Sequence, residues 1–99
     1  MAKYEVYLTR YSTGKIKNDT ETGAMTLKTA RMKAYRMVAH TGLNAGGDFK
    51  AEIYEIKYGS VLVIAGEVCN TVSDERYWYP DDGGKYKLYK DGSLGKRLR

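Results

Sequence analysis

The second half of the chain consists of short β-type segments separated by links too short to hold a crossover helix. One link is the tight turn Tyr58-Gly59-Ser60, and another is Pro80–Gly84, where one proline, two aspartates and two glycines are a strong turn signal. Strands joined by links of hairpin length pair antiparallel. The segments expected to be strands are Ala51–Tyr58, Val61–Cys69, Arg76–Tyr79 and Lys85–Tyr89. These links favour a mainly antiparallel sheet.

The first half adds one strand and a polar connection. In Tyr4–Tyr11 the residues Tyr4, Val6 and Leu8 alternate with more polar ones, which predicts a strand with one face in the core. Residues 12–25 are rich in Ser, Thr, Asn, Asp and Gly, so we expect a polar connection, with room for a short strand near Lys15–Lys17.

One segment has helical spacing. Leu27–Thr41 places Ala30 and Ala34 on its apolar stripe, where small side chains allow close approach to a sheet. Thr26 is a suitable N-cap, and Gly42 is a suitable C-terminal stop.

These elements predict one α+β domain, residues 1–99, with an antiparallel sheet of about five strands in the order β-α-β-β-β-β. The single amphipathic helix packs on one face, which leaves the other face solvated, filled by curvature or buried against a partner. Val61–Gly66 is short and rich in β-branched residues, so we expect a buried strand. Ser93–Arg99 either adds an edge strand or frays as a basic tail.

No apolar run approaches the roughly 20 residues of a membrane span, and Met1–Val6 enters a strand directly without a signal peptide. The single cysteine fits a reducing compartment. We therefore expect a cytoplasmic protein.

The charge of the chain is concentrated at one end. The net charge is +5, and residues 85–99 hold six basic residues and one acidic residue, which accounts for the whole excess. Such a patch attracts phosphate backbones or an acidic protein surface. We expect a basic C-terminal hairpin and tail at 85–99.

Aromatic residues are interleaved with these cations. Nine of the ten tyrosines lie in predicted strands, which sheet packing alone can explain. In the last hairpin Tyr77 and Tyr79 share a face, Trp78 points away, and Lys85 and Lys87 share a face. Rings beside ammonium groups are used by sheets that stack bases and hold phosphates. A lysine-guarded edge that prevents aggregation is the other explanation. The candidate binding residues are Arg76, Tyr77, Trp78, Tyr79, Lys85, Tyr86, Lys87, Tyr89, Lys90, Lys96, Arg97 and Arg99.

No catalytic or metal-binding constellation is evident. His40 is the only histidine, near a helix end, and is expected to be an ordinary surface residue, while Cys69 is expected to be a buried, inert thiol. Asp81–Gly84 lacks the spaced ligands of a calcium loop, and Gly42, Gly46 and Gly47 form no phosphate-binding pattern. We therefore expect neither an enzyme nor a metal site nor a cofactor.

Taken whole, the chain resembles the small accessory proteins of bacterial viruses and prophages. The similarity lies in the short chain, the opening Met1-Ala2-Lys3-Tyr4-Glu5-Val6, the tyrosine-rich hairpins and the closing run from Tyr89 to Lys96. The resemblance implies steric inhibition of a host defence complex, including CRISPR nucleases, in the bacterial cytoplasm. Many such inhibitors are acidic mimics of DNA, whereas this chain is basic. It would therefore engage RNA, DNA or an acidic protein surface, and the resemblance assigns no functional residue.

We accordingly expect a non-catalytic binding protein of phage or prophage type that contacts nucleic acid or a nucleoprotein complex. The alternative is a self-associating structural or assembly subunit, in which the uncovered sheet face or the Val61–Cys69 strand pairs with a copy of itself.

Overall fold

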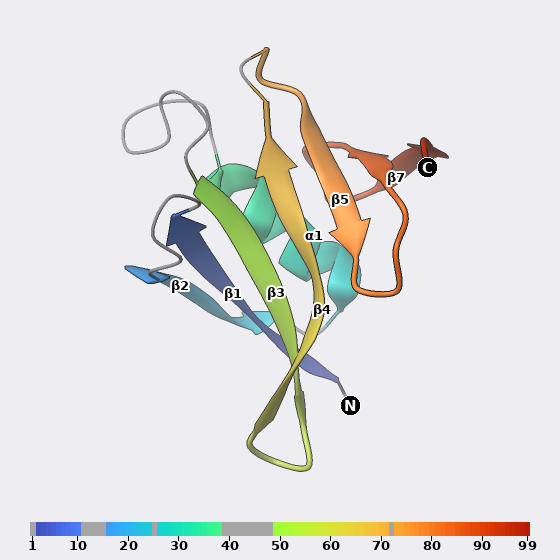
Figure 1. Cartoon of the computed structure of the whole chain (residues 1–99). Helices are drawn as coiled ribbons and strands as arrows, with labels where there is room; N and C mark the ends of the chain where they lie inside the picture. Colours follow the sequence, from blue (N-terminus) through green and yellow to red (C-terminus); the bar gives the residue numbers. More distant parts are fainter. Residues whose placement is uncertain (1, 11–15, 25, 39–48, 72) are drawn as a thin grey trace.

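The structure is a computed structural model that describes residues 2–10, 16–24, 26–38, 49–71 and 73–99 (Figure 1). The elements follow in the order β1 (Lys3–Arg10), β2 (Ile16–Ala24), α1 (Leu27–Met37), β3 (Phe49–Lys57), β4 (Val61–Asn70), β5 (Arg76–Pro80), β6 (Tyr86–Leu88) and β7 (Leu94–Arg97). The predicted α+β class with one helix and a mainly antiparallel sheet is confirmed in the described residues.

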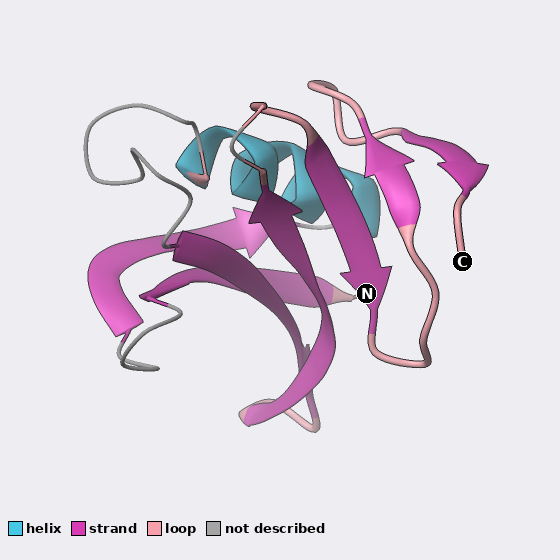
Figure 2. Ribbon diagram, turned by 45° about the horizontal axis from the view of Figure 1, so that its top comes forward, coloured by secondary structure: helices cyan, strands magenta, loops and turns pink. Residues whose placement is uncertain are grey.

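The strand number was underestimated. Over the described ranges, one sheet of seven strands, in the order β2-β1-β3-β4-β5-β6-β7, replaces the predicted five, and every neighbouring pair is antiparallel. Figure 2 shows this sheet curling around the side on which α1 lies.

The two additional strands lie where the sequence only allowed for a strand, near Lys15–Lys17 and within Ser93–Arg99, because neither segment has the alternating pattern of a half-buried strand. β2 contains mostly polar residues and is placed by pairing with β1, for example Tyr4 opposite Ala24 and Thr9 opposite Ile16. β7 pairs with β6, so the Ser93–Arg99 segment contains an edge strand and is not a frayed tail. Backbone pairing, not alternating hydrophobicity, defines both strands.

The helix begins as predicted and ends earlier. The Thr26 side chain accepts a hydrogen bond from the Thr29 N–H at 3.1 Å, which confirms the N-cap. The helix ends at Met37, four residues before the predicted end, and Val38 has left helical geometry. Gly42 lies outside the described residues, so its capping role stays a prediction.

The core lies between α1 and one face of the sheet. Ala30 and Ala34 of the helix are fully buried, together with Val6 of β1, Ile53 of β3 and Val68 of β4. The alternation predicted for β1 is confirmed, because Val6 and Leu8 are buried and Tyr4 packs against the same cluster. The two helix alanines permit the predicted close approach.

We call the opposite side of the sheet the open face. Tyr7 of β1 and Tyr54 of β3 lie on it with ring centroids 5.5 Å apart in an edge-to-face contact. Lys50 of β3 forms an ion pair with Glu67 of β4 at 2.8 Å on the same face. The open face therefore carries tyrosines and charges, whereas apolar side chains fill the helix side.

Val61–Gly66 is not the buried strand that we expected. Val61, Leu62 and Val63 are 48%, 46% and 37% exposed, and Gly66 is the first buried residue of β4. The reason is positional, because this part of the β3–β4 hairpin extends past the region covered by α1 (Figure 1).

Candidate functional site

The candidate site is built on β5, whose residues alternate between the two faces of the sheet. Arg76 and Trp78 point to the helix side and are 8% and 2% exposed. Tyr77 and Tyr79 are half-buried and point to the open face. Tyr77 lies opposite Lys87 of β6. The sequence prediction that the two tyrosines share a face and that Trp78 points away is confirmed.

Three cations lie over the two tyrosine rings. Lys85 Nζ is 4.4 Å from the ring centroid of Tyr77 and 5.9 Å from that of Tyr79. Lys87 Nζ is 5.4 Å from the Tyr77 centroid, and Arg99 Cζ is 5.6 Å from the Tyr79 centroid. We call these five residues the cationic tyrosine patch. Two strands, β5 and β6, the connection between them and the end of the chain meet here, although the residues lie up to 22 positions apart in the sequence.

An acidic residue borders this patch. Glu75 accepts a hydrogen bond from the Tyr77 hydroxyl, and its Oε2 lies 3.6 Å from Lys87 Nζ. The hydrogen bond from Tyr77 and the charge of Lys87 hold the pKa of Glu75 below its usual range. The same hydrogen bond raises the pKa of Tyr77. Glu75 therefore stays ionised at neutral pH and neutralises part of the positive charge.

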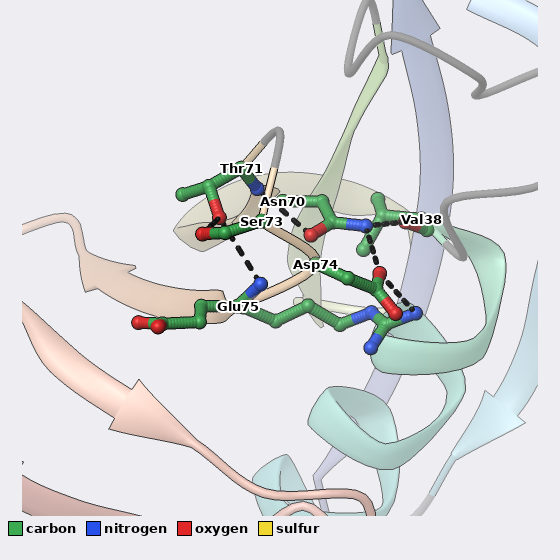
Figure 3. Close-up of polar contacts among 7 residues, drawn as sticks. Val38, Asn70, Thr71, Ser73, Asp74 and Glu75 are labelled. Carbon is green, nitrogen blue, oxygen red and sulfur yellow. Dashed lines mark hydrogen bonds and ion pairs between the residues drawn. The ribbon is translucent and has the colours of Figure 1, made fainter.

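The turn between β4 and β5 positions Glu75. The Glu75 N–H donates to Thr71 Oγ1 at 3.0 Å (Figure 3). The Thr71 N–H donates to the Glu75 carbonyl oxygen at 3.0 Å. Asp74 adopts a left-handed conformation with φ 62°, which reverses the chain within few residues. We did not single out Glu75 as a partner of this site from the sequence. Its i to i+2 spacing from Tyr77 places both on one face of a strand and is the signal that could have found it.

Tyr89 extends the patch toward β7. Its side chain is 50% exposed and lies against Gly95. A Cβ atom at Gly95 would lie 2.9 Å from Tyr89 Cε2 and 3.2 Å from Lys87 Cβ. The absence of a side chain at Gly95 thus allows the Tyr89 ring to lie next to Lys87.

Trp78 does not belong to this surface, although we expected it among the binding residues. Its indole packs against Gly66, where a Cβ atom would lie 2.5 Å from Trp78 Cη2. The Arg31 guanidinium covers the other accessible part of the ring, with Cζ 5.6 Å from the centroid. Strand alternation points the ring to the helix side, and a glycine on the neighbouring strand makes room for it there.

Arg76 is also removed from the predicted site. Its Nη2 lies 3.2 Å from Asp74 Oδ1, and its Cζ lies 4.0 Å from the Tyr35 ring centroid. Asn70 Nδ2 donates to the same Asp74 oxygen at 2.9 Å and to the Val38 carbonyl oxygen at 2.7 Å (Figure 3). Arg76 therefore belongs to a network that ties the β4–β5 turn to the end of α1.

The remaining predicted residues lie around the patch and not in it. Tyr86 pairs with Trp78 and packs against the core, with Arg97 Cζ 5.8 Å from its ring centroid. Lys90 in the β6–β7 turn and Lys96 on β7 are exposed. These two lysines contribute to the general positive field of the C-terminal strands.

Cys69 and the Asp81–Gly84 turn are the described residues for which we expected no catalytic or metal-binding role. Cys69 is half-buried on the open face beside Tyr77, so the predicted burial was wrong, and its inertness stays a prediction. The loop at Asp81–Gly84 is a turn as expected, with the Gly83 N–H donating to the Pro80 carbonyl oxygen at 3.1 Å. His40, Gly42, Gly46 and Gly47 lie outside the described residues.

Within the part of the chain that the structure describes, no group of three His, Cys, Asp or Glu side chains could hold a metal ion. Over the same residues, the single helix is too short and too polar to cross a membrane. Comparison of the chain with protein-family models, with curated proteins and with solved structures finds no match.

Proposed function

We propose that this chain is a non-catalytic binding protein whose cationic tyrosine patch contacts single-stranded nucleic acid. The observation that carries the proposal is the arrangement of Tyr77 and Tyr79 on one face of β5, with Lys85, Lys87 and Arg99 over their rings. Aromatic rings that stack on bases, together with cations that hold phosphates, are the combination by which sheet surfaces bind single strands.

The spacing of the rings suits splayed bases. Two residues along a strand are separated by roughly 6.7 Å. This is about twice the 3.4 Å per nucleotide along one strand of a stacked duplex. Bases stacked on Tyr77 and Tyr79 would therefore be unstacked from each other, which is the usual state of single-stranded nucleic acid bound to a sheet.

The cations now lying over the rings would have to move when bases arrive. An exposed cation–π contact contributes about 0.5–1 kcal/mol. Base–aromatic stacking contributes about 1–3 kcal/mol for each base, and a displaced ammonium group gains a phosphate as its new partner. The exchange is favourable on this balance, so the lysines and Arg99 leave the ring faces and pair with phosphates when bases stack on the tyrosines.

The relation to phage and prophage accessory proteins, with inhibition of a host defence complex, stays a prediction because no comparison bears on it. A nucleic-acid contact is compatible with that role, since defence nucleases carry guide or target strands. An acidic protein surface could satisfy the cations but would make no use of paired rings suited to bases.

Fluorescence anisotropy with a labelled single-stranded oligonucleotide, measured at several salt concentrations, tests the proposal. Each cation that neutralises a phosphate of a single strand contributes about 0.7 to the slope of log affinity against log salt. The double variant Lys85→Gln/Lys87→Gln should therefore lower the magnitude of this slope by about 1.4. Tyr79→Leu should weaken binding by roughly fivefold to 150-fold while leaving the slope nearly unchanged.

The matched control removes the same charge from elsewhere on the molecule. Lys28 on α1 and Lys57 at the end of β3 are both exposed, and neither belongs to the patch. The variant Lys28→Gln/Lys57→Gln should keep most of the affinity and the salt slope. Equal losses in the two double variants would reduce the interaction to general charge attraction, and no binding at low salt would refute the proposal.

A further inference from the structure

The β3–β4 hairpin exposes three consecutive apolar residues. Val61, Leu62 and Val63 are 48%, 46% and 37% exposed, and the adjacent Tyr58 is 91% exposed. Figure 1 shows this hairpin extending beyond the rest of the sheet. An exposed apolar cluster at a projecting hairpin is unusual for a monomer and marks an interaction site.

One backbone edge of this hairpin has no neighbouring strand. β5 pairs with β4 from Asn70 only as far as Gly66, which lies opposite Pro80. The last backbone contact is the Asp81 N–H donating to the Ala65 carbonyl oxygen at 3.0 Å, after which the chain turns away. Among the described residues, Val61–Ile64 therefore pairs with β3 alone.

This edge lacks the features that normally prevent sheets from joining. Protective edges carry lysine, proline or other charges that oppose an incoming strand. The edge here reads Val61-Leu62-Val63-Ile64 and is flanked by Ser60 and Ala65, so it has no charge and no proline. The nearest charges, Lys57 and Glu55, lie on β3 opposite Val61 and Val63 and have opposite signs.

We propose that this edge pairs with the same edge of a second copy of the chain. Because side chains alternate between sheet faces, a two-fold axis perpendicular to the sheet allows only registers that join residues of the same face. The register centred on Leu62 places Leu62 opposite Leu62 and Val61 opposite Val63 of the second copy. Val61, Leu62 and Val63 then have only apolar partners and Ile64 lies opposite Ser60, so the central part of this segment is self-complementary.

The charges of the chain fit this arrangement. In the same register, one row of residues across the joined sheet begins at Lys57 of one copy and finishes at Glu55 of the other copy. No like charges therefore oppose each other. The free edge is on the β5 side of β4, below the point where β5 ends opposite Gly66, so the basic strands of residues 85–99 lie on the contact side of β4 but past the end of the joined segment.

The contact is small. Pairing of about five residues on each side buries less than the roughly 1,200–2,000 Å² of a standard protein interface. The monomer should therefore predominate at low micromolar concentration and the dimer near about 1 mM. No residue of the cationic tyrosine patch pairs in this register, so a substitution at Leu62 changes the contact without changing a patch residue.

Sedimentation equilibrium of the full chain, from about 10 µM to about 1 mM, tests this inference. The dimer should form reversibly, and Leu62→Lys should weaken it at least about tenfold, because the register brings two ammonium groups together. Leu98→Lys is the matched control, since Leu98 is 52% exposed and lies just after β7, outside the pairing segment. Its dissociation constant should change by less than about twofold.

Mixing variants tests the register itself. Leu62→Lys and Leu62→Glu should each be mainly monomeric, and an equal mixture should regain a dimer because a lysine then lies opposite a glutamate. Circular dichroism establishes that both variants remain folded. A wild-type chain that stays monomeric at about 1 mM, equal weakening by Leu98→Lys, or a mixture that remains monomeric would each overturn the inference.

Discussion

Replacement of Gly66 by alanine tests the position of Trp78, on which the composition of the candidate site depends. A Cβ atom at Gly66 would lie 2.5 Å from Trp78 Cη2 and 2.5 Å from the Tyr79 carbonyl oxygen. Real carbon contacts are about 3.5–4.0 Å. One of the groups must therefore move by about an ångström to accept the methyl group.

Neither group can move at low cost. Trp78 is 2% exposed and packs in the core, and the Tyr79 carbonyl belongs to the backbone of β5 where it pairs with β4. Overpacking of a core costs about 1–3 kcal/mol, and a collision with two fixed groups belongs at the upper end. A loss of about 3 kcal/mol would lower the Tm of a domain of this size by about 12–24 °C.

The assay is urea unfolding followed by tryptophan fluorescence and by far-UV circular dichroism. Trp78 is the only tryptophan of the chain, so its emission reports on this site alone. Gly95→Ala is the control, because its Cβ would also approach a ring, at 2.9 Å from Tyr89 Cε2. Tyr89 is half exposed and can rotate away, so we expect a change within about 0.5 kcal/mol.

Gly66 has φ 157° whereas Gly95 lies outside the positive-φ region, so the expected loss for Gly66→Ala includes backbone strain as well as the collision. A loss below about 1 kcal/mol for Gly66→Ala, or an equal loss for Gly95→Ala, would contradict the packing of Trp78 against Gly66. Trp78 would then return to the set of candidate binding residues on the surface.

Two further predictions concern the acidic neighbour of the patch and the network behind it. Glu75→Gln should raise affinity for a single-stranded oligonucleotide roughly twofold to fivefold, because it frees Lys87 from an exposed ion pair. The hydrogen bond from Tyr77 lowers the pKa of Glu75, so its stabilising contribution is fully present above the usual glutamate pKa and is lost as the pH falls through the lowered value. Binding should strengthen over that same acidic range in the wild type and not in Glu75→Gln, as titration by anisotropy would reveal. Asn70→Ala removes a buried hydrogen bond to the Val38 carbonyl and should cost about 1–3 kcal/mol in urea unfolding, and an unchanged midpoint would contradict the tie between the β4–β5 turn and α1.

Local patterns predicted the elements that have strong local causes. The alternation at Val6 and Leu8 identified the core face of β1, and Thr26 identified the start of the helix. The glycine and proline turns identified the hairpins, because these residues adopt turn conformations at little cost. Alternation along β5 also predicted that Tyr77 and Tyr79 share a face. These features depend on a few neighbouring residues, which is why the sequence alone was sufficient.

Other features depend on which strands become neighbours. β2 extends well beyond the short strand expected near Lys15–Lys17, because it is polar and is defined by its pairing with β1, and the exposure of Val61–Val63 follows from the position of this hairpin past α1. The gathering of Lys85 and Arg99 over the rings also needs long-range pairing. Alternation placed Trp78 and Tyr79 on opposite faces, but it could not decide which face was buried, and that depends on the helix and on the space left by Gly66 on the adjacent strand. The sequence by itself determined the hairpins, the helix and the excess of positive charge, while the tertiary structure decided which rings and cations share a surface, since that requires contacts between residues distant along the chain.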